Sequence, residues 1–158
     1  MSILFLDIDG VLNYDTMEPI IEDDVNPGFH GIHMIDPEKV ELLNALICQT
    51  NCDVVISSTW RQKFTIEEMS TMLRVRGFVG KVIDMTPRPF KVNEREWSQK
   101  SDEIAAWLQA HPSIDTFVIL DDDEFLALQN FHVKTNSQYG LTTEDVGKAV
   151  AILQVSCV

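Results

Sequence analysis

The chain has 158 residues and a mass of 17.9 kDa; 45% of its residues are hydrophobic and 23% are charged, which is typical of one globular domain. Twelve Lys and Arg residues against 25 Asp and Glu residues leave a formal net charge of −13, which disfavours general binding to nucleic acids or anionic membranes. The chain contains no apolar run of the ~20 residues that span a bilayer, no basic leader, and an odd number of cysteines. We therefore expect a soluble, cytoplasmic protein with no membrane partner.

From the N-terminus, the first predicted elements are a strand, a helix and a second strand. Residues 3–8 form a nearly continuous apolar run that ends in acid, as expected of a parallel strand buried on both faces. Asp36 followed by Pro37 predicts a helix start, because aspartate caps a helix well and proline suits its first turn. Residues 53–56 form the next β-branched run and the second strand.

The middle of the chain continues this alternation. A capping box of Thr65 and Glu68 predicts a helix that ends near Gly77. Residues 81–83 are predicted to form a short third strand, and Ser101 is predicted to open the helix that follows.

In the last third of the chain, residues 116–120 are predicted to form a fourth strand that again ends in acid. A short helix is expected over residues 124–129, with its leading acids suited to the helix dipole, and an edge strand over residues 132–135. Thr142 and Asp145 predict the cap of the final helix.

Strands that alternate with helices predict an α/β fold with a doubly wound parallel sheet, here a single domain over residues 1–158. Two irregular segments interrupt the pattern. Residues 13–35 are rich in Pro and Gly and too long for a simple connection, so we expect a flap over the carboxyl edge of the sheet. Residues 85–100 carry four basic side chains in an otherwise acidic chain.

The most informative motif is Asp7-Ile8-Asp9-Gly10 at the end of the first strand. Two carboxylates two residues apart in a strand point to the same side, and Gly10 allows a sharp turn after them. In a doubly wound sheet, ligands bind beyond the carboxyl ends of the strands. We therefore interpret the pair as part of a functional site rather than as an ordinary solvated strand end.

This motif resembles the first motif of the haloacid dehalogenase (HAD) superfamily of phosphotransferases, and the other three motifs of that superfamily occur in order. Ser57 matches the hydroxyl after the second strand, Lys100 the basic residue before a helix, and Asp121-Asp122 the acidic pair that closes a strand. The resemblance covers nearly the whole chain. The Ser-Ser-x-Trp-Arg and Glu-Ile-x-x-Trp-Leu patterns are similar to small HAD domains, some of which are fused to RNA-repair enzymes.

The resemblance implies a phosphoric monoester hydrolase in which Asp7 is the nucleophile and forms an aspartyl-phosphate. Asp9 would protonate the leaving alcohol as general acid and then accept a proton from water as general base. Ser57 would donate a hydrogen bond to a phosphoryl oxygen, and Lys100 would balance the charge of that oxygen and of Asp7.

Four carboxylates in one site repel one another unless a cation lies among them. Mg²⁺ is the expected cofactor, because it prefers oxygen ligands and commonly accompanies phosphate. By the resemblance, Asp7 would bind it through its side chain and Asp9 through its backbone carbonyl. Asp122 is the predicted direct ligand of the acidic pair, and Asp121 is expected to bind directly or through water.

Neighbouring residues compete for some of these roles. Ser58 is an alternative to Ser57 at the phosphate, and Lys91 or Arg95 is an alternative to Lys100. A separate set of two His and two Cys residues has zinc-binding chemistry, but its spacing departs from the usual zinc patterns: His30, His33, Cys48 and Cys52. A buried, inert thiol is the expected state of Cys48, late in an apolar helix face.

The residues predicted to line the substrate are Ser58, Arg61, Gly10 and Asn13. Arg61 is expected either to bind a second anionic group of the substrate or to form a salt bridge with the acidic flap. Without a cap domain the chain resembles the capless HAD group, which often acts on macromolecular ends. A nucleotide or a nucleic-acid phosphate end is therefore the first substrate expected, and nucleic acid is expected only as a substrate.

Two other functions use the same residue types. A receiver-type phospho-acceptor module also has an acidic Mg²⁺ site, a hydroxyl and a lysine on a doubly wound sheet, but its motifs come in a different order. A non-catalytic HAD-like interaction module would be expected to lack Asp7 or Asp9, and both are present. Catalysis is therefore the favoured interpretation.

Overall fold

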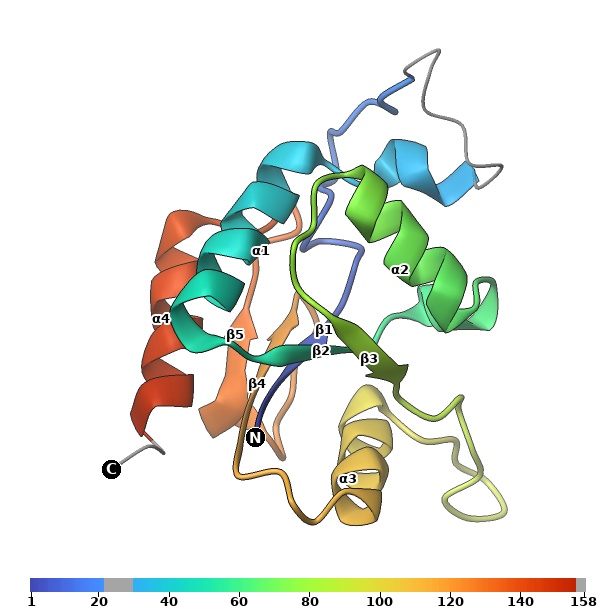
Figure 1. The fold of residues 1–158 in the computed structure, drawn as a ribbon. Helices are drawn as coiled ribbons and strands as arrows, with labels where there is room; N and C mark the ends of the chain where they lie inside the picture. The colour runs from blue at the N-terminus through green and yellow to red at the C-terminus, as the bar shows by residue number, and fades with distance from the viewer. Residues whose placement is uncertain (22–29, 156–158) are drawn as a thin grey trace.

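The computed structural model describes residues 1–21 and 30–155, so the part of the predicted flap over residues 22–29 lies outside the described residues. One five-stranded parallel sheet has the order β3-β2-β1-β4-β5 (Figure 1). The strands are β1 (Ser2–Leu6), β2 (Asp53–Ile56), β3 (Val82–Met85), β4 (Thr116–Asp121) and β5 (His132–Lys134). Because β1 is central, the residues that follow it stand between those that follow β2 and β4.

Helices cover both faces of this sheet. The described α-helices are α1 (Pro37–Thr50), α2 (Ile66–Val75), α3 (Lys100–Ala110) and α4 (Thr143–Val155). One face is covered by α1, α2 and α4 and the other by α3, which confirms the predicted doubly wound α/β fold (Figure 1). Among the described residues, no helix is both long enough and apolar enough to cross a bilayer.

The central strand is buried on both faces, as its continuous apolar sequence predicts. Leu4 and Leu6 pack with the apolar residues of α1, α2 and α4, while Ile3 and Phe5 point to the opposite face. There the ring of Phe5 meets Trp107 of α3 edge to face, with the ring centroids 5.4 Å apart. Burial on both faces gives the carboxyl end of β1 a rigid base.

The helix starts predicted from capping residues are confirmed. The Asp36 carboxylate accepts a hydrogen bond from the backbone amide two residues on, at 2.8 Å. Thr65 and Glu68 cap each other's backbone amides at 3.2 and 2.8 Å. The Asp145 carboxylate accepts from the Thr142 amide at 3.0 Å. Each bond satisfies a donor that a helix start leaves without a partner.

The predicted helix over residues 124–129 is wrong. The chain bends there, and only a short 3₁₀ turn, η3 (Gln129–Phe131), precedes β5. The acids expected to start a helix make tertiary ion pairs instead: Glu124 pairs with Lys134 of β5, and Asp123 lies 3.3 Å from the ammonium of Lys100. β5 pairs in parallel directly beside β4, so residues 122–131 form the whole crossover between the two strands, with a 3₁₀ turn in place of the predicted helix.

Other boundaries also differ from the predictions: β4 extends to Asp121 instead of residue 120, and β5 ends at Lys134 instead of residue 135. β1 ends at Leu6, because the chain then turns so that the amide of Leu12 bonds the carbonyl of Ile8 at 2.8 Å. β3 lies at Val82–Met85 instead of residues 81–83. α3 starts at Lys100, one residue early, because the Gln99 amide bonds the carboxylate of Asp102 at 2.8 Å.

The described part of the predicted flap is anchored to α2. It contains a 3₁₀ turn, η1 (His30–Met34), whose Ile32 carbonyl accepts a hydrogen bond from the Arg76 guanidinium at 3.0 Å. The amide of Ile20 donates to the carbonyl of His33 at 2.9 Å, which joins the two described ends of the segment.

Candidate active site

The ends of β2, β1 and β4 bring Ser57, Asp7 and Asp121 to one edge of the sheet. The Ser57 amide donates to the carbonyl of Leu6 at 2.8 Å, and the Asp7 amide donates to the carbonyl of Leu120 at 3.0 Å. These bonds continue the strand pairing one residue beyond β1 and β2. The sheet itself therefore sets the positions of the predicted nucleophile, the predicted phosphate donor and an acid of the last motif.

Three carboxylates gather at this edge. Asp7, Asp121 and Asp122 each offer an oxygen within 4.8 Å of the others, and the first two are buried. Burial, and then the neighbouring charge of Asp7, raises the pKa of Asp121 to about 7, and the same causes raise the pKa of Asp122. The negative charge of this cluster is thus only partly compensated by protein groups.

Lys100 is the cation of the cluster. Its ammonium donates to Asp7 Oδ2 at 2.7 Å and to Asp121 Oδ2 at 2.8 Å. Burial alone lowers the pKa of Lys100, but the two carboxylates outweigh it and raise that pKa above its ordinary value, so the ammonium stays charged. The other candidates, Lys91 and Arg95, make no such contact within the described residues.

The structure separates the two serines that competed for the phosphate. Ser57 is fully buried, and among the described residues its Oγ is the buried side-chain oxygen left without a hydrogen-bond partner. Ser58 Oγ instead accepts from the amide of Trp60 at 3.3 Å and caps a 3₁₀ turn, η2 (Thr59–Gln62). Because buried hydroxyls are normally paired, Ser57 is the one available to a ligand.

Asp9 lies beyond the strand, so the same-face argument from strand geometry does not apply to it. Its carboxylate is exposed and held at both oxygens: Asn13 Nδ2 donates to Oδ1 at 2.9 Å, and Trp60 Nε1 donates to Oδ2 at 3.0 Å. The role of Trp60 was missed from the sequence. The sequence feature that could have indicated this role is the Ser-Ser-x-Trp-Arg pattern, because it places a tryptophan close to the strand end that carries Ser57.

Gly10 and Asn13 shape the loop that carries Asp9. Gly10 has φ +73°, and a Cβ on it would lie 2.5 Å from Cγ of Asp122, so a side chain there would displace that carboxylate. Asn13 is buried; its Oδ1 accepts from the Gly10 amide at 2.9 Å, and its Nδ2 also donates to the carbonyl of Met34 at 3.1 Å. Contact of either residue with substrate stays a prediction.

Arg61 has a different partner from the one expected. It is 3% exposed and forms a buried ion pair with Glu103 of α3, so within the described residues the predicted salt bridge to the flap is wrong. Its guanidinium also donates to the carbonyls of Ser58 at 2.6 Å and Pro87 at 3.2 Å. Arg61 thereby ties the chain after Ser57 to α3 and to the segment after β3.

The candidate zinc residues form no metal-binding group within the described residues, and the side chain of His30 lies outside them. Cys48 is exposed, contrary to the expected burial, whereas Cys52 is buried and its pKa is raised by that burial. His33 Nδ1 lies 2.9 Å from the carbonyl oxygen of Ile20, so His33 helps to hold the two described ends of the predicted flap together.

Comparison with known protein families matches residues 3–146 to a family described as the HAD domain in Swiss Army Knife RNA repair proteins. No curated protein and no solved structure matches the chain. The matched range includes all four motifs and most of the sheet, and a HAD domain indicates a hydrolase of the phosphatase type. The chain therefore belongs to the family of HAD domains found in Swiss Army Knife RNA repair proteins.

Proposed function

We propose that this protein is a Mg²⁺-dependent phosphatase that hydrolyses a phosphate monoester through an aspartyl-phosphate on Asp7. One arrangement carries the proposal: Lys100 bridges Asp7 and Asp121 beside a buried Ser57 hydroxyl that has no hydrogen-bond partner among the described residues. Hydrolysis of a phosphate ester requires charge neutralisation around the phosphoryl group and an aligned nucleophile. These side chains supply both at one edge of the sheet.

The donor set fits a hard divalent cation. Asp7, Asp121 and Asp122 present only oxygen ligands, and burial together with the charge of Asp7 raises the pKa of Asp121 to about 7, so a bound cation would favour its ionised form. These three residues would hold Mg²⁺, which when bound would neutralise charge on the phosphoryl oxygens.

The chain's own residues would divide the chemistry between two steps. A carboxylate oxygen of Asp7 attacks phosphorus, and the leaving alkoxide takes a proton from Asp9. Asp9 then accepts a proton from the water that hydrolyses the aspartyl-phosphate, which returns both residues to their starting states. Ser57 and Lys100 donate hydrogen bonds to phosphoryl oxygens throughout, so charge that develops there is stabilised.

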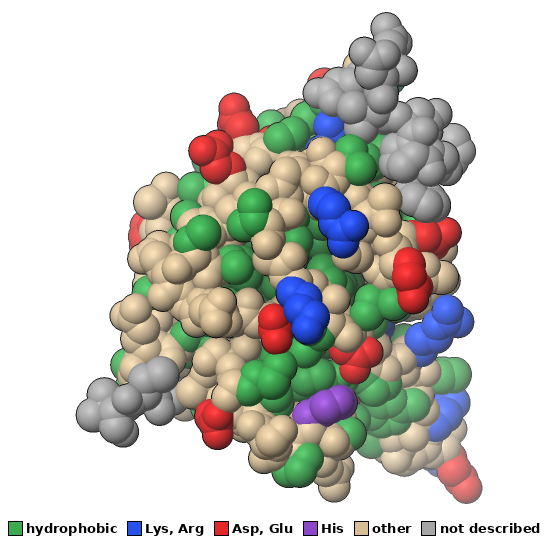
Figure 2. All heavy atoms as spheres, viewed as in Figure 1, with side chains coloured by type: hydrophobic (Ala, Val, Ile, Leu, Met, Phe, Trp, Pro, Cys, Tyr) green, Lys and Arg blue, Asp and Glu red, His purple; other side chains and the backbone are tan. Residues whose placement is uncertain are grey.

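A nucleotide or a nucleic-acid phosphate end is the proposed substrate. The support comes from the family description, which names RNA repair proteins. On the face shown in Figure 2, Lys and Arg side chains stand as separate groups rather than as one basic patch, in keeping with the net charge of −13. Recognition of such a substrate would therefore depend on local contacts near the site rather than on a long basic groove.

Trp60→Phe tests whether the indole N–H positions Asp9. We expect this change to slow hydrolysis of an alkyl phosphate about 10-fold or more and to slow 4-nitrophenyl phosphate much less, since nitrophenolate leaves without a proton from Asp9. The measurement is kcat for the two esters. Phe64→Leu is the control, because Phe64 packs against the Trp60 ring, with the ring centroids 5.7 Å apart, and its side chain has no group that could hydrogen-bond Asp9. Equal losses for both esters would contradict the positioning role.

Ser57→Ala and Ser58→Ala are expected to act in opposite ways. Removing the unpaired Ser57 hydroxyl should leave the free energy of unfolding unchanged or raise it by about 1 kcal/mol, yet lower kcat/KM about 100-fold. Ser58→Ala loses a cap and should lower the free energy of unfolding by about 1 kcal/mol with a smaller loss of activity. Denaturant unfolding and steady-state kinetics check both. A larger loss of kcat/KM for Ser58→Ala than for Ser57→Ala would instead assign the phosphate contact to Ser58.

The proposed function is tested by hydrolysis of 4-nitrophenyl phosphate with Mg²⁺ and with excess chelator, followed by phosphorylated oligonucleotides. Turnover that requires Mg²⁺ supports it. Release of a single equivalent of nitrophenol per protein, with no turnover, would instead indicate a phospho-acceptor module. If no ester reacts, binding of beryllium fluoride, which mimics a phosphoryl group, is measured with and without Mg²⁺. Mg²⁺-dependent binding would support phosphoryl transfer at this site, and no binding would refute it.

A further inference from the structure

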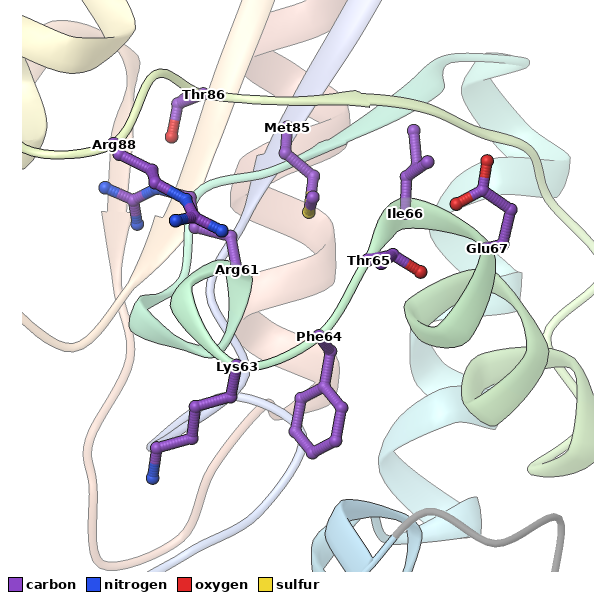
Figure 3. Close-up of a pocket in the computed structure, with 9 residues that line it drawn as sticks. All are labelled: Arg61, Lys63, Phe64, Thr65, Ile66, Glu67, Met85, Thr86 and Arg88. Carbon is purple, nitrogen blue, oxygen red and sulfur yellow. The ribbon is translucent and has the colours of Figure 1, made fainter.

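A cavity of about 310 Å³ lies at the same edge of the sheet as the active site, beyond the ends of β2 and β3 (Figure 3). It lies between η2, the start of α2 and the residues that follow β3. Two of its lining residues bond the strand end that carries Ser57: Arg61 donates to the carbonyl of Ser58, and the amide of Thr86 donates to the carbonyl of Ile56 at 2.9 Å. The cavity therefore lies beside the backbone of the strand end that carries Ser57, and its described lining does not include the acidic cluster or Lys100.

The cavity is cationic at one end, has an acid at the other end, and is partly apolar between them. Figure 3 shows Arg61 and Arg88 at one end, Ile66 and Glu67 at the other, and Met85 between them. Its size is at the lower end of the range for small-molecule pockets, roughly 300–1,000 Å³. Such walls suit a ligand with a flat, weakly polar body and an anionic group at one end.

Arg88 is the cation that remains available there. The Arg61 guanidinium is already bonded to Glu103, Ser58 and Pro87. Arg88 is exposed and forms no ion pair with any described residue, and the same holds for Lys63, although its side chain points away from Arg88 in Figure 3. Three of the twelve basic residues of this acidic chain thus line one cavity, against a single acid.

We propose that this cavity receives the leaving group of the substrate and that Arg88 binds a second phosphate on it. The inference rests on the proposed function and narrows its substrate to a nucleoside that carries a phosphomonoester and a further phosphate. One phosphate occupies the Asp7 site, the nucleoside lies along Met85 and Ile66, and the second phosphate meets the guanidinium. A guanidinium is suited to this task because it bonds phosphate oxygens in pairs.

The test compares adenosine 3′,5′-bisphosphate with adenosine 3′- and 5′-monophosphate. Wild-type kcat/KM should be about 10- to 100-fold higher for the bisphosphate, the effect of one hydrogen-bonded charge pair. Arg88→Gln should remove most of that preference. Arg95→Gln is the matched control, because Arg95 is an exposed cation of the same loop that does not line the cavity, and it should keep the preference.

Three results would overturn the proposal: equal use of mono- and bisphosphates by the wild type, equal effects of Arg88→Gln and Arg95→Gln, or equal use of fructose 1,6-bisphosphate, which lacks a base. A phosphorylated dinucleotide, which carries the same phosphate pair, separates a nucleic-acid end from a free nucleotide. Calorimetric binding of the same compounds to Asp7→Asn with Mg²⁺ needs no turnover. Tighter binding of the bisphosphate than of the monophosphates, lost in a variant that also carries Arg88→Gln, would support the proposed phosphate site even if no phosphatase activity is found. Equal binding of mono- and bisphosphates would refute it.

Discussion

Asp7→Asn is expected to lower Mg²⁺-dependent turnover by at least about 10⁴-fold while the protein stays folded. Asparagine has the same shape as aspartate, but its amide cannot attack phosphorus, and the change also removes one negative charge from the acidic cluster. Lys100 keeps its contact with Asp121 Oδ2 at 2.8 Å, so we expect the free energy of unfolding to change by no more than about 1 kcal/mol. Initial rates with 4-nitrophenyl phosphate and denaturant unfolding measure the two effects.

Asp9→Asn is the matched variant for that experiment. It leaves the nucleophile in place and removes the proton donor and acceptor, so a loss of about 10²- to 10⁴-fold is expected. Because the second step also needs Asp9, the variant should accumulate a phosphorylated protein that acid quenching traps, whereas Asp7→Asn should not. Trapped phosphate on Asp7→Asn, or activity retained by it, would assign the nucleophile to another residue.

Glu103→Ala is expected to lower the free energy of unfolding by about 3–5 kcal/mol. The change leaves the guanidinium of Arg61 buried without its carboxylate, since both side chains are 3% exposed. Burial raises the pKa of Glu103 even though Arg61 acts in the opposite direction, so the pair itself contributes little net stability. The loss would come from the unpaired charge left behind. Equilibrium unfolding in urea measures it.

The double variant Arg61→Met/Glu103→Leu is the control for this prediction. It removes both charges and should recover most of the lost stability, as apolar residues in place of a buried pair often do. Recovery should be incomplete, because the carbonyls of Ser58 and Pro87 lose the donor they have in Arg61. A Glu103→Ala loss below about 1 kcal/mol would mean that water or another side chain compensates Arg61.

Most of the candidate site was predictable because it follows directly from strand ends. Asp7, Ser57 and Asp121 each come immediately after, or at the end of, a buried hydrophobic strand, and parallel strands end at the same edge. Lys100 was predictable from its place before a helix, although the structure includes it in α3. The helix over residues 124–129 failed because its acids form ion pairs with Lys134 and Lys100 that local sequence does not show.

By itself, the sequence determined the parallel sheet, the helix caps and the strand ends that carry carboxylates and a hydroxyl, since these depend on local periodicity and on residues within one turn of each other. Only the tertiary structure decided the partners of Asp9 and Arg61. The Trp60–Asp9 bond joins residues 51 positions apart, and the Arg61–Glu103 pair joins residues 42 positions apart. Contacts over such separations depend on how helices and loops pack on the finished sheet, and that packing also formed the cavity beyond the ends of β2 and β3 and left Arg88 at its wall.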